Sequence, residues 1–503
     1  MGDLFLSIDI GTSSIRAVLF DTDGVPRHSE SVECSLTATG DGRAEVDPEL
    51  VFESVLAVTG KCVRESGVQR SCIAGIGMSC HMHSLMLVDG KGRPMTGLMT
   101  WADTRAAAEA DYIARSFDIG DLYKRTGCRV QHPMYPLSKV LWFKRNEPEL
   151  FRAAHRFITI KEYIIYRLYG SFAVDRTLAS CQGFYNINLQ KWDEDIIHDL
   201  LGITEDNLSE VVECTHVLKG FRPEFETPLG LSKDTPLVMG SGDGIMANIG
   251  CGVYDSTSLS STIGTSGAIR TAVDRPLLDK HQRTWCYSFT KDMWVAGGAI
   301  NNGGLVLKWI REEFRKQFEF DAREYGESIY KLFDRFASQV SPGSDGLVFL
   351  PYLTGERSPD WNANARGIMF GLGYSHTRKH IIRAAMEGVM YRMYSVFEVM
   401  AALEDGAQHI RANGGYARSD LWLQMQADIF NKEITVSKVE EASALGAAFI
   451  SMVSLGAVKS IREPLPAMQP QKAIKPIEEN HRIYRKAYEL SKQIYSSLYP
   501  GIQ

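Results

Sequence analysis

The sequence predicts an α/β protein made of two related domains, and three observations lead to this prediction. The chain has 503 residues, which is enough for two to four domains of ordinary size. Two strand-like runs, residues 4–10 and 15–20, flank the turn Gly11-Thr12-Ser13-Ser14. A similar segment, residues 260–270, recurs about half a chain later. That offset is too long for a solenoid repeat, so it indicates two domains that share one strand-turn-strand device.

The elements that follow the first turn support a sheet covered by helices. A third strand is expected at residues 25–32, after Asp23-Gly24, and completes a meander. Residues 47–65 predict a helix, with Asp47 as its cap and Pro48 at its first position. Residues 73–78 predict a short buried strand. The first domain therefore begins as a three-stranded meander that is followed by a helix and a further strand.

The rest of the chain continues the same mixture of strands and helices. Strands are expected at residues 236–239 and 347–352. Helical segments are expected at residues 303–314, in a charged stretch to about 339, and at 376–403, 419–430, 443–455 and 481–499. The chain has no long linker, so the boundary is placed near residues 250–254, giving domains 1–251 and 252–503.

Composition narrows the class of protein. Acidic residues number 61 and basic residues 55, and 44% of the residues are hydrophobic. That apolar fraction excludes disorder as the main state, and the mildly acidic balance argues against a nucleic-acid partner. No window approaches the roughly 18 consecutive apolar residues of a membrane helix, and the start of the chain has no basic signal-peptide region.

The nine cysteines are scattered and form no C-x-x-C pair. This pattern predicts free thiols and a cytoplasmic protein. A homodimer is among the assembly states that the sequence leaves open.

The sequence predicts phosphate binding by turns other than a Walker loop. The sequence lacks G-x-x-x-x-G-K-[ST], G-x-G-x-x-G and the protein-kinase motifs. Instead, small residues at Gly11-Thr12-Ser13 let backbone N–H groups approach an anion closely. Asp9 would repel a bare polyphosphate but fits if Mg²⁺ lies between them. The turn Gly264-Thr265-Ser266 offers a second phosphate cradle.

Asp243 is the second acidic candidate, because it lies among glycines where the predicted strand 236–239 ends. A solvent-exposed turn residue is the alternative interpretation. Asp9 and Asp243 are together the candidate metal ligands, and they allow a division of labour. One carboxylate would hold the metal, and the other would accept a proton from an attacking hydroxyl group.

Several motifs, in the right order along nearly the whole chain, resemble the FGGY family of carbohydrate kinases. They are the Asp9-x-Gly-Thr-Ser turn, residues 134–142, residues 367–372 followed by 380–387, and Gly414-Gly415-Tyr416-Ala417-Arg418-Ser419. The resemblance implies two ribonuclease-H-like, actin-type ATPase domains with ATP in the cleft between them. It also accounts for the internal repeat.

Within the family, the chain looks most like the gluconokinases. The stretches concerned are residues 82–86, 100–105, 298–304, 354–357 and 361–367. Xylulokinases usually carry Trp-Asn-Asp where this chain has Trp101-Ala102-Asp103, and tend to have Asp-Asn where it has Asp243-Gly244. The resemblance thus implies an ATP- and Mg²⁺-dependent kinase that converts D-gluconate to 6-phospho-D-gluconate. A xylulokinase, another polyol or ketose kinase, and a non-catalytic actin-like sugar sensor are the alternatives.

The family resemblance also implies roles for individual residues. Asp243 matches the general base and Asp9 the metal-side carboxylate. The positions that match phosphate and nucleotide contacts are Gly11, Thr12, Ser13, Thr265, Gly304, Lys308, Gly414, Gly415 and Ser419. The sugar-facing positions are Met82, His83, Trp101 and Asp103. For His83 and Trp101, a place in the packed core is the alternative interpretation.

Gluconate differs from a neutral polyol by one carboxylate, so a selective site needs a cation or several N–H donors for it. Arg105 and Lys161 are the two candidates. Arg105 could instead begin a helix and pair with Asp103 or Glu109, and Lys161 could be a solvated helix residue. Backbone donors or another residue remain open as further alternatives.

Overall fold

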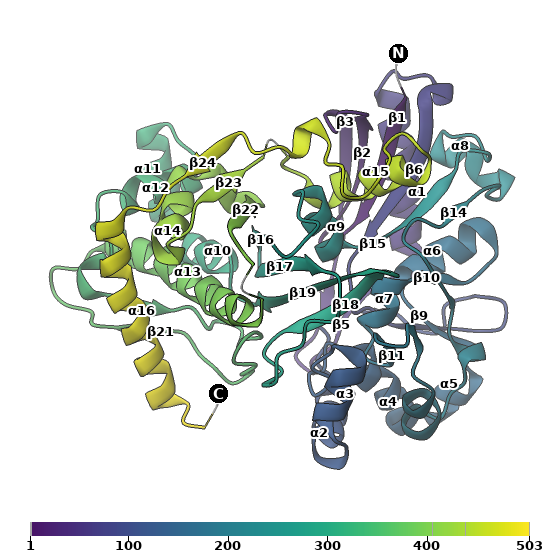
Figure 1. Cartoon of the computed structure of the whole chain (residues 1–503), viewed down its shortest axis with the longest axis horizontal. Helices are drawn as coiled ribbons and strands as arrows, with labels where there is room; N and C mark the ends of the chain where they lie inside the picture. The colour runs from purple at the N-terminus through teal and green to yellow at the C-terminus, as the bar shows by residue number, and fades with distance from the viewer. Residues whose placement is uncertain (1–2, 405, 438, 502–503) are drawn as a thin grey trace.

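The computed structural model describes residues 3–404, 406–437 and 439–501. Residues 1–2 and 502–503, the outer ends of the two predicted domains, lie outside the described residues, as do residues 405 and 438. Figure 1 shows two lobes, the first half of the chain on the right and most helices of the second half on the left. Each lobe contains one large mixed sheet. This confirms the predicted α/β class with two related halves.

The first sheet has six strands in the order β14-β15-β6-β1-β2-β3. The strands β1, β2 and β3 form an antiparallel meander, while β6 and β15 run parallel to β1. Their bounds are β1 Leu4–Ile10, β2 Ser14–Asp21, β3 Pro26–Glu33, β6 Ile73–Cys80, β14 Val217–Leu218 and β15 Leu237–Gly242. The predicted strands of this half are therefore confirmed. Their apolar runs fill the interior because both faces of β1, β6 and β15 are buried.

The second sheet repeats the arrangement, with one extra strand at its edge, in the order β18-β19-β17-β16-β22-β23-β24. Here β16, β17 and β19 form the meander, and β22 and β23 run parallel to β16. The bounds are β16 Ser258–Ile263, β17 Gly267–Val273, β18 Trp285–Thr290, β19 Met293–Ile300, β22 His409–Asn413, β23 Ile434–Val436 and β24 Lys472–Ile474. The sequence repeat thus corresponds to a repeated sheet topology.

Short strands form smaller sheets around these two. They pair as β4 Thr37–Ala38, β5 Ala44–Val46 and β8 Leu98–Met99; β7 Met86–Val88 and β9 Arg156–Ile158; β10 Ala173–Asp175 and β13 Glu210–Val212; β11 Tyr185–Asn186 and β12 Lys191–Trp192; β20 Val348–Leu350 and β21 Ile368–Phe370.

Helices of the first half begin with α1, where the Asp47 side chain accepts a hydrogen bond from Glu49 N as predicted for a cap. The helices are α1 Pro48–Glu65, α2 Ala107–Ser116, α3 Ile119–Thr126, α4 Pro136–Asn146, α5 Pro148–Ala153, α6 Ile160–Tyr169, α7 Arg176–Ser180, α8 Glu226–Leu229 and α9 Asp243–Gly250. Asp243 directly follows β15, as predicted, and the alternative interpretation of it as a turn residue is wrong, because the strand passes directly into α9 at Gly242.

Helices of the second half match the predicted segments closely. They are α10 Leu305–Glu313, α11 Arg315–Tyr325, α12 Ile329–Ala337, α13 Arg378–Leu403, α14 Asp420–Phe430, α15 Ala442–Ser454 and α16 Glu478–Leu498. The charged stretch is not one helix, since left-handed Gly326 ends α11 before Ser328 caps α12.

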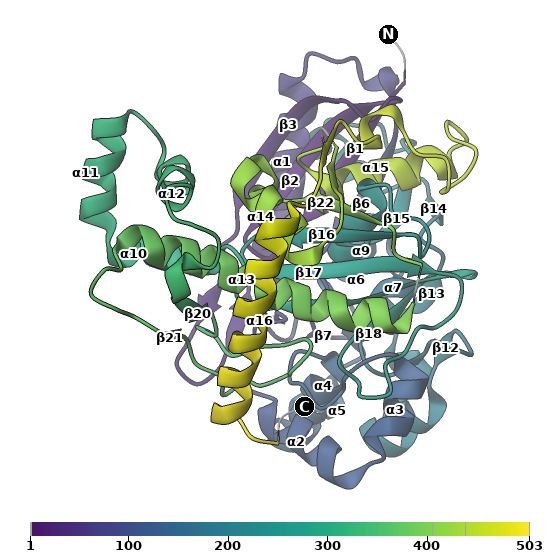
Figure 2. The same ribbon diagram turned by 60° about the vertical axis from the view of Figure 1, so that its left-hand side comes forward.

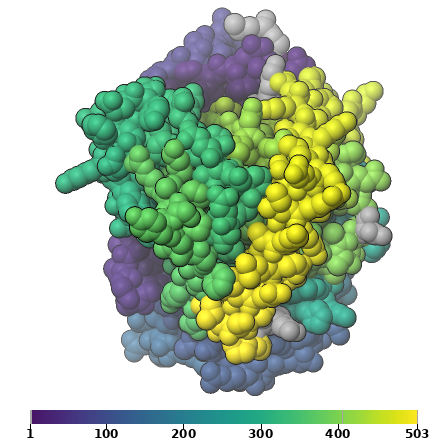
Figure 3. Space-filling model, turned by 90° about the vertical axis from the view of Figure 1, so that its left-hand side faces the viewer, coloured from purple at the N-terminus to yellow at the C-terminus, as the bar shows by residue number. Residues whose placement is uncertain are grey.

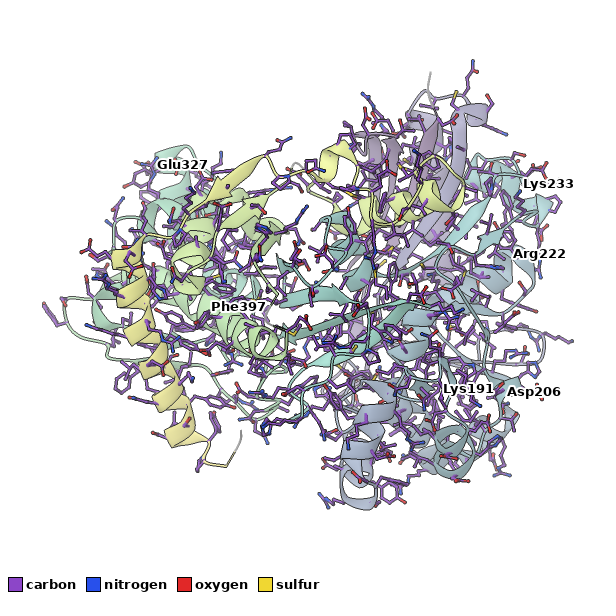
Figure 4. All side chains as sticks on the ribbon, viewed as in Figure 1. Lys191, Asp206, Arg222, Lys233, Glu327 and Phe397 are labelled. Atoms are coloured by element: carbon purple, nitrogen blue, oxygen red, sulfur yellow. The ribbon has the colours of Figure 1, made fainter. Side chains whose placement is uncertain are left out.

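The C-terminal helix α16 covers the second lobe. It crosses in front of α13 in Figure 2 and runs along the outer face in Figure 3. Tyr488 of α16 donates a hydrogen bond to Glu398 of α13. Figure 4 shows Phe397 of α13 inside this lobe, whereas Asp206 and Lys233 lie at the outer edge of the first lobe. Within the described residues, no helix combines the length and apolarity needed to cross a membrane.

One helix of the second half belongs spatially to the first lobe. Helix α15 packs on β1 and β6 and crosses α9 at backbone distance. A Cβ at Gly77 of β6 would lie 2.1 Å from Ala447 O, and one at Gly446 would lie 2.0 Å from Met246 O. Such close approach requires glycine. The contact of α15 with α9, β1 and β6 therefore fastens this part of the second half to the first lobe.

Candidate active site

Two neighbouring cavities open at the ends of the central strands. We call them the inner cavity and the outer cavity. The inner cavity, of about 240 Å³, is lined by Met82, His83, Trp101 and Asp243 of the first half and by Arg270 and Arg357 of the second. The outer cavity, of about 520 Å³, is formed within the second half. Gly264 lines both, so the two cavities adjoin at this turn.

His83 is fixed in the wall of the inner cavity from both sides. Its backbone is left-handed, with φ of 65°, and its Nε2 lies 3.0 Å from the hydroxyl of Tyr287. The buried ammonium group of Lys139 donates to the carbonyl oxygens of His83 and Thr100, each at 2.7 Å. Burial, followed by the charge of Lys139, holds the pKa of His83 well below its usual value. A neutral imidazole therefore faces the cavity.

Trp101 connects the inner cavity with the first phosphate turn. Its indole Nε1 donates to Thr12 Oγ1 at 3.1 Å. On the opposite half, the guanidinium group of Arg357 lies over the indole ring, 5.4 Å from its centroid. Contacts from both halves therefore hold the indole ring in place.

Asp243 stands at the first position of α9, where β15 ends. A helix N-terminus favours a negative charge, but burial and the nearby charge of Asp9 outweigh it. Together they raise the pKa of Asp243 to about 6, against the opposing charge of Arg270. A carboxylate with this pKa accepts protons efficiently near neutral pH.

Asp9 lies at the end of β1, before the predicted phosphate turn. Burial raises the pKa of its carboxyl group, and its Oδ1 is a buried oxygen without a hydrogen-bond partner among the described residues. The adjoining turn is tight, since Gly11 N donates to Ser14 O at 2.9 Å, and it carries Thr12 and Ser13. Because a buried oxygen normally has a partner, this carboxylate fits a cation.

The outer cavity brings together most of the predicted nucleotide contacts. Thr265, Gly304, Lys308, Gly415 and Ser419 all line it. Gly304 N donates to Gly264 O at 2.7 Å, which fastens the start of α10 to the second phosphate turn. Gly414 is not among the lining residues, and a Cβ there would lie 2.6 Å from Ile263 O. The small size of Gly414 is therefore needed for the close packing of the turn, and not for the wall of the cavity.

The structure does not bring three predicted substrate residues into either cavity. Asp103 is fully buried, accepts from Ala44 N at 2.9 Å and pairs with Arg105, which also pairs with Glu45. Lys161 is fully buried and pairs with Asp175 at 2.7 Å. The placement of Arg105 and Lys161 beside the substrate is therefore corrected: both cations are neutralised by carboxylates of the scaffold.

Sequence reasoning missed two cavity arginines, Arg270 and Arg357. Among the described residues, neither has a carboxylate oxygen within 4.0 Å, and Arg270 Nε is buried without a hydrogen-bond partner. A signal was present for both. Arg270 ends the repeated segment and Arg357 ends Thr354-Gly355-Glu356-Arg357. The sequence could not show that both face one cavity, because that depends on the folding of segments 87 residues apart in the second half.

Comparison with known proteins agrees with this geometry. A model of the N-terminal domain of the FGGY family of carbohydrate kinases matches residues 4–250, and a model of its C-terminal domain matches residues 259–455. The gluconokinase of Bacillus subtilis (strain 168) is 39% identical over 486 residues, covering 96% of this chain and 94% of that protein.

Solved structures give the same picture. The gluconate kinase from Lactobacillus acidophilus aligns with a TM-score of 0.91 at 33% identity, over 99% of each chain. A ligand-bound xylulose kinase from the same species aligns with a TM-score of 0.91 at 32% identity, also over 99% of each chain.

Proposed function

The chain belongs to the FGGY family of carbohydrate kinases, and we propose that it is an ATP-dependent gluconokinase that converts D-gluconate to 6-phospho-D-gluconate. The observation that carries the substrate assignment is the charge of the inner cavity. Arg270 and Arg357 line it together with a single carboxylate, that of Asp243, and the lowered pKa of His83 leaves its imidazole neutral. Buried cations without a carboxylate partner are costly, so this cavity favours an anionic ligand.

Asp243 is assigned the role of general base. The sugar hydroxyl attacks the terminal phosphorus atom of ATP, its proton passes to the Asp243 carboxylate, and ADP leaves. The pKa of about 6 leaves this carboxylate mostly ionised at neutral pH. Trp101 and His83 would hold the sugar chain, since both line the cavity and both are fixed by hydrogen bonds.

The outer cavity is assigned to ATP. Its Gly264-Thr265-Ser266 turn would hold the phosphates at the passage to the inner cavity, and Lys308 adds a positive charge. The family's glycerol kinase from Plasmodium falciparum has been solved with ADP. The unpartnered Oδ1 of Asp9 fits Mg²⁺, with Asp243 as a second candidate ligand. When bound, Mg²⁺ neutralises charge on the phosphates.

A xylulokinase is the second candidate function. The xylulose kinase structure from Lactobacillus acidophilus is as similar in fold as the gluconate kinase structure. Xylulose is neutral and would give neither cavity arginine an anionic partner, which is the reason that gluconate is preferred.

The test is ADP release by the purified protein with ATP and Mg²⁺ on adding gluconate, xylulose, ribulose or glycerol. A kcat/KM for gluconate at least tenfold above the others is the expected result. Preference for xylulose would replace the proposal by the second candidate. ATP binding without turnover of any sugar would favour a non-catalytic sensor.

A further inference from the structure

Two arginines enter the inner cavity, and their surroundings differ. Arg270 lies beside the assigned base: a Cβ at Gly244, the residue after Asp243, would be 3.1 Å from Arg270 Nε. The nearest acidic charge to Arg270 is that of Asp243. Arg357 lies over the ring of Trp101, and its charge also acts on His83 and on Arg270. Arg270 is therefore placed beside Asp243, and Arg357 beside Trp101.

The guanidinium group of Arg357 is held rigidly. Its Nε donates to Asn301 Oδ1 at 2.7 Å, its Nη2 donates to Ile300 O at 3.1 Å, and its face lies over Trp101. No hydrogen bond of Nη1 occurs among the described residues. A group oriented in this way loses little further freedom when it binds a ligand.

The nearest carboxylate does not neutralise Arg357. Glu356 Oε1 accepts from the backbone N–H groups of Asn301 and Arg357, at 2.6 and 2.9 Å. Its Oε2 lies 3.6 Å from Arg392 Nε. The charge of Glu356 is therefore shared with Arg392, and the cavity side of Arg357 keeps free donors.

We propose that Arg357 binds the carboxylate of the sugar-acid substrate and thereby determines selectivity for it. This inference rests on the proposed function. Asp243 must lie at the hydroxyl that is phosphorylated, and in gluconate the carboxylate is at the other end of a six-carbon chain. Arg270 lies beside Asp243, so Arg357, over the ring of Trp101, is the cavity arginine that we assign to the carboxylate. A site built to hydrogen-bond a polar group discriminates strongly against an analogue that lacks it.

The experiment compares D-gluconate with D-gluconamide, which replaces the carboxylate by a neutral amide on the same chain. Arg357→Met is expected to lower kcat/KM for gluconate by roughly 10- to 150-fold, the range for a hydrogen bond to a charged group. The loss for gluconamide is expected to be about threefold or less, so the variant nearly abolishes the preference for the acid. Arg357→Lys, which keeps the charge but not the fork of donors, should restore part of it.

Two further variants serve as controls. Arg323→Met removes an exposed positive charge from α11 and should change neither substrate. Arg270→Met should lower turnover of both substrates to a similar extent, because Arg270 lies beside Asp243. Circular dichroism and thermal unfolding show whether each variant is folded. If Arg357→Met does not fold, the same comparison is made with Arg357→Lys. We then expect kcat/KM to fall for gluconate and not for gluconamide.

Three results for Arg357→Met would overturn the inference. They are equal losses of kcat/KM for gluconate and gluconamide, no loss for either substrate, or a KM that rises for ATP but not for gluconate. The proposed function fails separately: wild-type protein that phosphorylates only neutral sugars contradicts both proposals before any variant is made. Wild-type protein that prefers gluconate, with a selectivity unchanged in Arg357→Met, contradicts the role of Arg357 alone.

Discussion

The two halves of the molecule use the same sheet for different chemistry. In the first half, the ends of β1, β6 and β15 present Asp9, His83 and Asp243. In the second half, the ends of β16 and β22 present Gly264-Thr265-Ser266 and Gly414-Gly415, which carry no charged side chain. The comparison teaches that the scaffold was kept while the strand ends diverged, one set toward proton and metal chemistry and the other toward close backbone approach.

The two phosphate turns show this divergence at single residues. In the first, Asp9 pairs with Arg16 and Ile10 with Ile15; in the second, Thr262 pairs with Ala268 and Ile263 with Gly267. The second turn is thus one residue shorter, and a threonine replaces the aspartate two residues before its glycine. Only the first turn can supply a carboxylate to a cation.

The largest expected effect on kcat is that of replacing Asp243. This carboxylate has no counterpart in the second phosphate turn. Asp243→Asn keeps the shape but cannot accept the hydroxyl proton, so kcat should fall about 10²–10⁴-fold. ATP binding, measured by calorimetry, should stay within a few fold of wild type. A folded variant with near-normal kcat would remove Asp243 as the base.

The next effect compares Asp9 with Thr262, its counterpart in the second turn. Asp9→Ala should raise the Mg²⁺ concentration for half-maximal activity at least about 10- to 100-fold, because it removes a metal-side carboxylate. Thr262→Ala, the matched control, should leave the Mg²⁺ dependence unchanged. Titrating Mg²⁺ at saturating ATP and gluconate measures both. A collapse of gluconate affinity in Asp9→Ala with an unaltered Mg²⁺ response would contradict the assignment.

The presence of the two carboxylates Asp9 and Asp243 in the first half also predicts how kcat/KM depends on pH. The base acts only when it is deprotonated, and the pKa of Asp243 is raised to about 6 by burial and by Asp9. From pH 7 downward kcat/KM should therefore fall, reaching about a tenth of its plateau one unit below that pKa. Asp9→Asn removes a neighbouring negative charge and should move the acidic limb to lower pH. A limb that does not move in this variant would show that another group titrates.

The smallest effect is expected on the nucleotide side. Lys308 is exposed on α10 at the rim of the outer cavity, so its interaction with a phosphate is screened by solvent. Lys308→Ala should raise KM for ATP only about two- to fivefold and should leave KM for gluconate unchanged. Initial rates at varied ATP, repeated at high salt, test this: a large effect on kcat would mean that Lys308 touches the transferred phosphoryl group.

Local features of the fold could be predicted from the sequence because local physics determines them. The meander around Gly11-Thr12-Ser13, the cap at Asp47 and the helices of the second half depend on apolar periodicity and turn residues. The position of Asp243 at the end of a strand could be predicted, but the start of a helix there could not, because the glycines on either side of it also allowed a turn. Here the packing of α9 against α15 overrides local preference.

Residues of the site could be predicted only where they belong to a motif. Motif residues such as His83, Thr265 and Ser419 do line the cavities. The sequence allowed Arg105 to pair with Asp103, and the structure shows this pair, but the second partner of Arg105, Glu45, is 60 residues away. Lys161 could not be placed, because its partner Asp175 lies in another element. Such ion pairs decide whether a cation is available to a substrate.

The position of α15 has a consequence for how the protein is made. This helix covers β1 and β6 of the first sheet, yet its residues are 442–454 of a chain of 503. During synthesis the ribosome releases the first sheet hundreds of residues before the helix that completes its packing. Domains of most proteins fold in order as they emerge, but here the first lobe stays incomplete until residues 442–454 have been synthesised. A truncated product ending near residue 440 would lack the helix that covers β1 and β6.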